Sequence, residues 1–370
     1  MGKHLVLVGG GHAHLLTIAN LDKFIARGHS VTVIGPSDDH YYSGMGPGML
    51  GGIYAPEEIR FATRKTAEKM GGTFVKGTVS AIDPKTKTVF LESGESLPYD
   101  VLSLNAGSYV PVDSVLNGDT EVFTAKPIER LLKARHRIVD RCAFQKVRVG
   151  VIGGGAAAVE LAGNVWRLLS TYARHCFDVS VFSKNHILEK FPEKIRTAVR
   201  RSLRSRSIRI FENSPAAVIK TGEIRLDSGK IHEADFVFLA TGVKPSPLFA
   251  ESRLPIGPDG GLLVNRHLQS TGYSEIFGGG DCIYFQDNPL EKVGVYAVRQ
   301  NPVLLHNLMA ALNGKSLGSF DPGGSFLLIL NLGDGTGIFY RNRLIFGGRL
   351  AFVIKDYIDR RFMRRFRFLE

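Results

Sequence analysis

Apolar and polar positions follow the same order in two separate stretches of the chain. In the first, an apolar run at residues 5–8 leads into Gly9-Gly10-Gly11, and residues 14–27 have the pattern of a helix. A second apolar run follows at residues 30–34. This order of strand, glycine turn, helix and strand predicts one βαβ unit of a parallel sheet.

The second stretch repeats the design. The apolar residues 147–152 lead into Gly153-Gly154-Gly155, residues 156–170 are expected to form a helix, and residues 179–182 form the next apolar run. Two βαβ units in one chain predict an α/β protein with two Rossmann-like dinucleotide-binding domains and a C-terminal β/α segment.

Shorter apolar segments between and after these units predict further strands, at residues 73–75, 88–91, 101–104, 236–239 and 276–277. The division that we predict is an FAD-binding domain formed by residues 1–108 and 242–320, an NAD(P)-binding domain at 109–241, and a C-terminal segment at 321–370 that contains an amphipathic helix.

The first glycine turn is suited to a pyrophosphate. Backbone N–H groups of such a turn can approach phosphate oxygens, and the following helix directs its positive end at the same charge. The third glycine of the usual G-x-G-x-x-G spacing is replaced by His14, so we expect the helix to sit differently on the strand. The acid expected after the second strand is also absent, because Gly35-Pro36 stands there, ahead of Asp38 and Asp39.

The second glycine turn has the permitted spacing Gly153-x-Gly155-x-x-Ala158. Its second strand ends at Ser183-Lys184 rather than at an acid. A cation at this position suits the 2′-phosphate of NADPH, but Lys184 is equally explained as a solvated surface lysine.

Further motifs resemble the superfamily of flavoproteins that bind two dinucleotides, the pyridine nucleotide-disulfide oxidoreductases. These motifs are Ala240-Thr241-Gly242, Gly279-Gly280-Asp281 and the helix start Val159-Glu160-Leu161, and the resemblance spans residue 4 to about residue 310. It implies that Asp281 binds the ribityl chain of FAD and that Glu160 lies beside the nicotinamide, although Glu160 could also be an ordinary acid in the first turn of a helix.

The resemblance also assigns site residues. The FAD-binding residues it implies are Gly9, Gly11, His12, Ala13, Ala106, Gly107, Gly280, Asp281 and Tyr296. The NAD(P)-binding residues are Gly153, Gly155, Ala158, Glu160, Lys184 and Gly242.

Within the superfamily the chain is similar to the type II NADH dehydrogenase-like branch, and more narrowly to flavoproteins associated with selenide water dikinase. Residues 9–14, 42–48 and 294–300 carry this similarity. It implies an acceptor site at Tyr296, Arg299 and Gln300. The quinone pattern Ala-Gln-x-Ala-x-Gln is matched only by Gln300, and Tyr296 could equally be a core residue.

Cysteine usage limits the reaction type. Residues 35–60 contain no cysteine, which excludes a disulfide reductase that relays flavin electrons through a thiol pair. We expect Cys142, Cys176 and Cys282 to be buried structural thiols in a reducing compartment. No histidine spacing indicates a metal site.

The chain has a net charge of +12, part of it in a tail that alternates aromatic and basic residues. Phe352, Ile358, Phe362 and Phe366 fall near one face of a helix with arginines opposite, which predicts docking on the inner face of an anionic membrane. A packed terminal helix with a solvated basic face is the alternative. No apolar run is long enough to span a membrane.

These features together predict a cytoplasmic, peripherally membrane-associated FAD-dependent NAD(P)H dehydrogenase that uses NADH or NADPH and reduces a quinone-like acceptor. We expect no nucleic-acid partner, and a homodimer is possible. A sulfide- or selenium-linked flavin oxidoreductase and a flavoprotein without turnover remain as alternatives.

Overall fold

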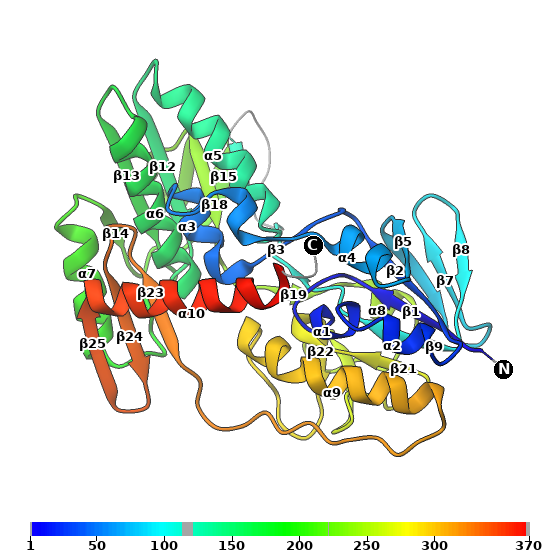
Figure 1. Ribbon diagram of the computed structural model, residues 1–370. Helices are drawn as coiled ribbons and strands as arrows, with labels where there is room; N and C mark the ends of the chain where they lie inside the picture. Colours follow the sequence, from blue (N-terminus) through cyan, green and yellow to red (C-terminus); the bar gives the residue numbers. More distant parts are fainter. Residues whose placement is uncertain (1, 113–120, 221, 368–370) are drawn as a thin grey trace.

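The computed structural model describes residues 2–112, 121–220 and 222–367. Two five-stranded parallel sheets organise the molecule, as Figure 1 shows. The first sheet has the order β21-β9-β1-β2-β5. Its strands are β1 (His4–Val8), β2 (Ser30–Gly35), β5 (Thr73–Lys76), β9 (Val101–Leu104) and β21 (Ile276–Gly278).

The second sheet has the equivalent order β11-β18-β12-β13-β14. Its strands are β11 (Glu121–Thr124), β12 (Val147–Ile152), β13 (Phe177–Phe182), β14 (Arg209–Phe211) and β18 (Phe236–Leu239). In each sheet the strand before the glycine turn is central, and its neighbours belong to the predicted set of apolar runs. The predicted α/β fold with two Rossmann-like domains is confirmed.

Helices cover both sheets. The long helices are α5 (Glu129–Cys142), α6 (Ala156–Tyr172), α7 (Glu193–Arg204), α9 (Gly294–Leu312) and α10 (Arg349–Arg367). The shorter ones are α1 (Leu15–Ile18), α2 (Asp22–Ile25), α3 (Gly46–Leu50), α4 (Thr63–Lys69), α8 (Leu248–Glu251), and the 3-10 turns η1 (Ser43–Met45), η2 (Pro56–Ile59) and η3 (Gly280–Cys282).

The prediction of a single helix at residues 14–27 is wrong in one respect, because the structure has two helices there, α1 and α2, separated by an interruption. At the interruption the Asn20 side chain donates to the Leu16 carbonyl oxygen at 2.7 Å, and the Asn20 N–H bonds to Thr17 instead of continuing the helical pattern. Such side-chain bonding to the backbone competes with the helical hydrogen bonds. Helix α9, which the sequence analysis treated only as a motif, packs against α1.

Small antiparallel sheets extend the two domains. One is the meander β6 (Val79–Asp83), β7 (Thr88–Leu91) and β8 (Ser96–Pro98), and another is β15 (Ala216–Lys220), β16 (Glu223–Leu226) and β17 (Ile231–Glu233). Two further antiparallel pairs are β3 (His40–Tyr41) with β4 (Arg60–Phe61) and β10 (Ser108–Tyr109) with β19 (Lys244–Pro245). In contrast, β20 (Leu262–Val264) and β22 (Ile283–Phe285) form a parallel pair.

The pair β10–β19 lies where the chain leaves the first domain and where it returns. These crossings fall beside the boundaries expected near Ser108 and Gly242. The domain limits themselves stay a prediction, since one apolar core joins α3, from the first segment, to α5 and α6 of the second domain.

The C-terminal segment forms the antiparallel sheet β23 (Leu328–Asn331), β24 (Gly337–Arg341) and β25 (Leu344–Gly348), followed by α10. Figure 1 shows α10, in red, running from this sheet toward the junction of the two domains. Strand β23 packs on α6, and Met363 and Phe366 of α10 belong to the same core as the second parallel sheet.

Candidate functional site

A cavity of about 330 Å³ runs along the carboxyl end of the first parallel sheet. Its lining includes Gly35 and Val79, the glycine turn at Gly9, and Gly294 at the start of α9. Ligands of open α/β sheets bind at this edge. Seven of the nine predicted FAD-binding residues line the cavity: Gly9, Gly11, His12, Ala106, Gly107, Gly280 and Asp281.

The glycine turn at this cavity needs its glycines. Gly9 has φ +89°, and a Cβ there would lie 2.3 Å from the Asn105 carbonyl oxygen. Gly280 also has a positive φ, of +79°. The side-chain nitrogen of Asn105 is buried without a hydrogen-bond partner, although Asn105 lines the cavity. A buried donor without a partner is costly, so this wall is suited to a ligand with acceptor oxygens, as the pyrophosphate of FAD has.

His14 explains how the helix tolerates the missing third glycine. Its ring is fully buried and spans from the Gly9 carbonyl oxygen, 2.7 Å from Nδ1, to the Ser103 hydroxyl, 2.8 Å from Nε2. Burial lowers the pKa of His14 to about 4, and the hydrogen bond to Gly9 offsets part of this. A neutral imidazole therefore ties the turn to strand β9.

Asp281 lies at the end of the first cavity with partners that the sequence did not reveal. Its carboxylate accepts a hydrogen bond from Ser108 at 2.9 Å and forms an ion pair with the ammonium of Lys126. Lys126 follows strand β11, 155 residues away in the chain, so no local pattern linked the two.

An aromatic cluster lies beside the His12 ring. His12 contacts His40 through a 3.3 Å nitrogen–nitrogen hydrogen bond and stacks near Phe362 of α10, with 6.2 Å between ring centroids. Tyr42 and Phe61 complete the cluster. Burial lowers the pKa of both histidines, that of His40 to about 4, and the Lys126 charge contributes in the same direction.

Two aromatic side chains of α10, Phe362 and Phe366, therefore face a different way from the one predicted from the sequence. Phe366 is only 7% exposed and packs on Phe61 with 5.8 Å between centroids, and Phe362 lies in the same cluster. We had expected both to face a membrane. They face inward because residues 40–61 of the first domain supply an aromatic surface that an isolated helix pattern does not show.

A second cavity, of about 700 Å³, lies at the carboxyl end of the second parallel sheet. Five of the six predicted NAD(P)-binding residues line it: Gly153, Gly155, Glu160, Lys184 and Gly242. Gly155 opens α6, and no atom within 4 Å would meet a Cβ there, which leaves room for a phosphate at the helix N-terminus. Ala158 is instead fully buried in the core beneath.

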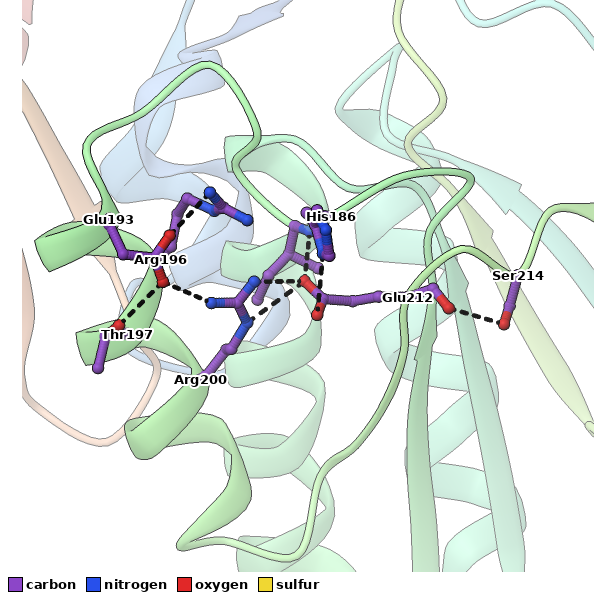
Figure 2. Close-up of polar contacts among 8 residues, drawn as sticks. His186, Glu193, Arg196, Thr197, Arg200, Glu212 and Ser214 are labelled. Carbon is purple, nitrogen blue, oxygen red and sulfur yellow. Dashed lines mark hydrogen bonds and ion pairs between the residues drawn. The ribbon is translucent and has the colours of Figure 1, made fainter.

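Glu212 holds the loop after β13, which carries Lys184, and Figure 2 shows its contacts with His186 and Arg200. The Glu212 carboxylate accepts the Ile187 N–H at 2.8 Å, binds Arg200 of α7 at 2.9 Å, and lies 3.4 Å from the His186 ring. Burial would raise the pKa of Glu212, yet the pKa is lowered because these partners favour the carboxylate. These contacts of Glu212 hold the cavity wall in place and do not involve Lys184.

Glu160 lines the second cavity and connects it to the C-terminal segment. Its carboxylate accepts the Asn331 N–H at 2.8 Å. Burial raises the pKa of Glu160, while the nearby Lys355 charge and the Asn331 N–H offset part of this rise. Lys355 itself donates to the Gly44 carbonyl oxygen and to Asp359, both at 2.8 Å.

The polar cluster of Glu160, Lys355, Asp359 and Tyr42 joins three parts of the chain. Burial would lower the pKa of Lys355, but Asp359 and Glu160 raise it, so the ammonium stays charged. The Tyr42 hydroxyl donates to Asp359 at 3.0 Å, and burial beside this carboxylate raises the Tyr42 pKa. The cluster can hold a proton near the second cavity as carboxylic acid or ammonium.

The two cavities meet. Ser43, Lys126 and Ile128 line both of them. A hydride passes only between atoms in near contact, so the wall that the two cavities share is where two redox rings could meet.

The three predicted acceptor residues have structural partners. Gln300 is 1% exposed and accepts the Gly280 N–H at 2.6 Å. Arg299 donates to the carbonyl oxygens of Pro322 and Gly324, and its guanidinium lies over the Tyr296 ring. None of the three lines either cavity, and Ala13 does not either. Their roles at an acceptor or flavin stay predictions.

The cysteine expectation holds for two of three residues. Cys142 and Cys282 are buried, and burial raises the pKa of Cys282 to about 11. Cys176 is exposed, contrary to our expectation, because it lies in the loop between α6 and β13. None of the three lines either cavity. Among the described residues, no group of three or more histidine, cysteine or acidic side chains is arranged to hold a metal.

Residues 3–307 match the pyridine nucleotide-disulphide oxidoreductase family. The chain belongs to this family. The match covers the extent that the sequence motifs predicted, and the cofactors of the protein are accordingly FAD and a nicotinamide dinucleotide. The chain lacks a cysteine pair at residues 35–60, so family membership here does not imply disulfide chemistry.

Curated relatives span nearly the whole chain. Ferroptosis suppressor protein 1 of Xenopus tropicalis is 27% identical, over 90% of this chain and 88% of the relative. A type II NADH:quinone oxidoreductase of Staphylococcus saprophyticus is 25% identical, over 97% and 94%. A demethylphylloquinone reductase of Synechocystis is 23% identical, over 85% and 80%.

Solved structures share the fold. NDH2 of Plasmodium falciparum, in complex with NADH, superposes with a TM-score of 0.83 at 14% identity, covering 98% of this chain and 96% of that chain. The sulfide:quinone oxidoreductase of Aquifex aeolicus gives 0.80 at 19% identity, covering 100% and 92%. At these identities the likeness establishes the fold alone.

Proposed function

We propose that this protein is an NAD(P)H:quinone oxidoreductase that works at a membrane surface, with FAD in the first cavity and NAD(P)H in the second. The observation that carries the proposal is the meeting of the two cavities at Ser43, Lys126 and Ile128. FAD would accept a hydride from the nicotinamide and pass two electrons on. The protein supplies position and electrostatics around that transfer.

Glu160 is the group suited to exchange protons. A quinone takes up two protons with two electrons, while a hydride brings only one. The raised pKa of Glu160 makes this side chain able to take up and release a proton at the second cavity, which it lines, while the Lys355 ammonium stays charged beside it. Glu160→Gln should therefore slow acceptor reduction more than it weakens NADH binding.

Quinone as the acceptor is supported by what the relatives are called, since two of them are named as reductases of quinones. The cysteines argue against the sulfide alternative, because none lines either cavity. The test is steady-state oxidation of NADH and of NADPH by purified FAD-bound protein, with a short-chain benzoquinone, a short-chain naphthoquinone or sulfide with quinone. Turnover only with sulfide, or FAD that NAD(P)H cannot reduce, would contradict the proposal.

The proposal that the protein works at a membrane surface rests on the outward face of α10. Leu350, Val353 and Tyr357 are 63%, 58% and 56% exposed and follow one another along one face of the helix. Leu344 of β25, 57% exposed, is a further exposed apolar side chain of the same segment. The exposed arginines Arg361, Arg364 and Arg365 continue toward the helix end. No helix among the described residues is long and apolar enough to cross a membrane.

An apolar stripe with adjacent arginines suits the headgroup region of an anionic bilayer, where each basic residue adds about 1 kcal/mol. The test is co-sedimentation with vesicles that contain an anionic phospholipid. The full chain should bind at low salt, and the double variant L350E/V353E should not. Equal binding of both proteins, or binding by neither, would remove the membrane part while leaving the redox part intact.

A further inference from the structure

Lys126 occupies a position that the proposed function does not yet explain. It is the one charged residue among the three that line both cavities. Its side chain is 27% exposed, and that of its partner Asp281 is 11% exposed. A charge at the meeting point of two ligand cavities acts on whatever reacts there.

The ammonium is held in place rather than free to swing. Asp281 binds it directly, and the Ser108 hydroxyl lies 3.4 Å from Nζ while donating to the same carboxylate. Two residues from two other segments, Asp281 and Ser108, thus hold the Lys126 ammonium at the wall. A charge fixed before reaction costs no reorganisation during it.

The field of Lys126 reaches along the first cavity. It contributes to the lowered pKa of His12 and of His40, second to burial in the case of His40. Of the acids on the same wall, Asp281 is the ion-pair partner of Lys126 and offsets part of its charge, whereas Asp39 is paired with Arg60 at 3.3 Å. The pKa of Glu129 is raised by its burial and by Asp39, which favours its neutral form.

We propose that the fixed ammonium of Lys126 stabilises the negative charge that the flavin ring gains on two-electron reduction. The nicotinamide gives up two electrons and one proton as a hydride, so it becomes a cation and the ring that accepts the hydride becomes an anion. The inference rests on the assignment of FAD to the first cavity. Fixed opposite charge in a partly water-excluded site is worth more than it is in water.

The test uses FAD-bound protein and three variants. K126M removes the charge, K126R keeps it, and K133M removes an equal charge from an exposed position on α5 outside both cavities. The first readout is the absorbance change on sulfite titration. Sulfite uses its sulfur lone pair to form a bond to flavin N5, which displaces a pair of ring electrons and leaves a negative charge on the ring. The second readout is the two-electron midpoint potential.

K126M should weaken sulfite binding at least tenfold and lower the midpoint potential by about 30 mV per tenfold loss in the reduction equilibrium. K126R should restore most of both, and K133M should match the wild type. The N-terminal turn of α9 also faces the first cavity at Gly294, but it is unchanged in every variant, so it cannot produce these differences.

Two results would overturn the inference. One is K126M with full FAD content, wild-type sulfite affinity and wild-type potential, which would make Lys126 a structural clamp for Asp281. The other is loss of FAD from K126M but not from K126R or K133M, which would make the charge an anchor for the cofactor. Failure of the wild-type protein to hold FAD would instead contradict the proposed function.

Discussion

The buried pair of Lys355 and Asp359 offers a quantitative test of how α10 is attached. The two side chains are 11% and 7% exposed and lie 2.8 Å apart. Removing one partner of a buried pair leaves an uncompensated charge and costs about 3–5 kcal/mol, whereas replacing both by apolar residues of similar size is often neutral. D359L should therefore destabilise the protein strongly, and K355M/D359L should recover much of that loss.

The measurement is urea denaturation of the FAD-bound variants, followed by far-UV circular dichroism and by fluorescence of the single tryptophan, Trp166, on α6. The matched control is D178L, which breaks the surface pair of Asp178 and Lys146, 34% and 42% exposed. An exposed pair contributes about 0–1 kcal/mol. If D359L lowers stability no more than D178L, or if the double variant shows the sum of the single losses, the pair does not hold α10 as described.

Three further predictions concern the cavities. G155V should fold and retain FAD yet raise the KM for NADH at least tenfold, because its side chain enters the open space before α6, whereas G324V, also at an open glycine, should not. Native protein should use NADPH at least as well as NADH, and K184E should shift preference to NADH in initial-rate assays; a strong native preference for NADH would contradict the role of Lys184. The pKa of His14 is about 4 in the folded protein and about 6.5 in the unfolded chain, so the unfolded chain takes up a proton more readily. His14 should therefore lower the stability of the protein by roughly 3 kcal/mol between pH 6.5 and pH 4. H14Q should flatten this pH dependence in urea titrations.

Strands were the most predictable part of the fold. The bounds expected for residues 88–91, 101–104, 147–152 and 236–239 are those of β7, β9, β12 and β18. Strands in the middle of a parallel sheet are buried on both faces, so they are short apolar runs that end at turn residues. Helix α9 was not predicted as a helix, because Pro302 interrupts its pattern and most of its faces are apolar; residues 294–300 were identified only as a motif.

The candidate site was predictable only where the residues that form it are adjacent in the sequence. The glycine turns at Gly9 and Gly153 carry their signal in adjacent residues and line the two cavities. Lys126 and Lys355 carry no such signal in adjacent residues. Lys126 binds Asp281, which is 155 residues away, and Lys355 binds the Gly44 carbonyl oxygen, which is 311 residues away. Such pairs are set by the packing of domains, and a lysine in a sequence looks the same whether it is buried or solvated.

The C-terminal helix has two faces, and this changes how membrane attachment must be tested. Lys355 and Phe366 lie inward, in the polar cluster and the core, while Leu350 and Val353 lie outward. If α10 served only to dock on a membrane, truncation before Arg349 would leave a folded, FAD-bound enzyme that loses membrane binding alone. Removing the helix would instead leave Glu160 without its neighbouring ammonium and expose the aromatic cluster at Phe61. Truncation should therefore lower stability and activity with soluble acceptors as well as vesicle binding. Only substitutions on the outward face separate the two roles, since they change the apolar stripe and leave every inward contact in place.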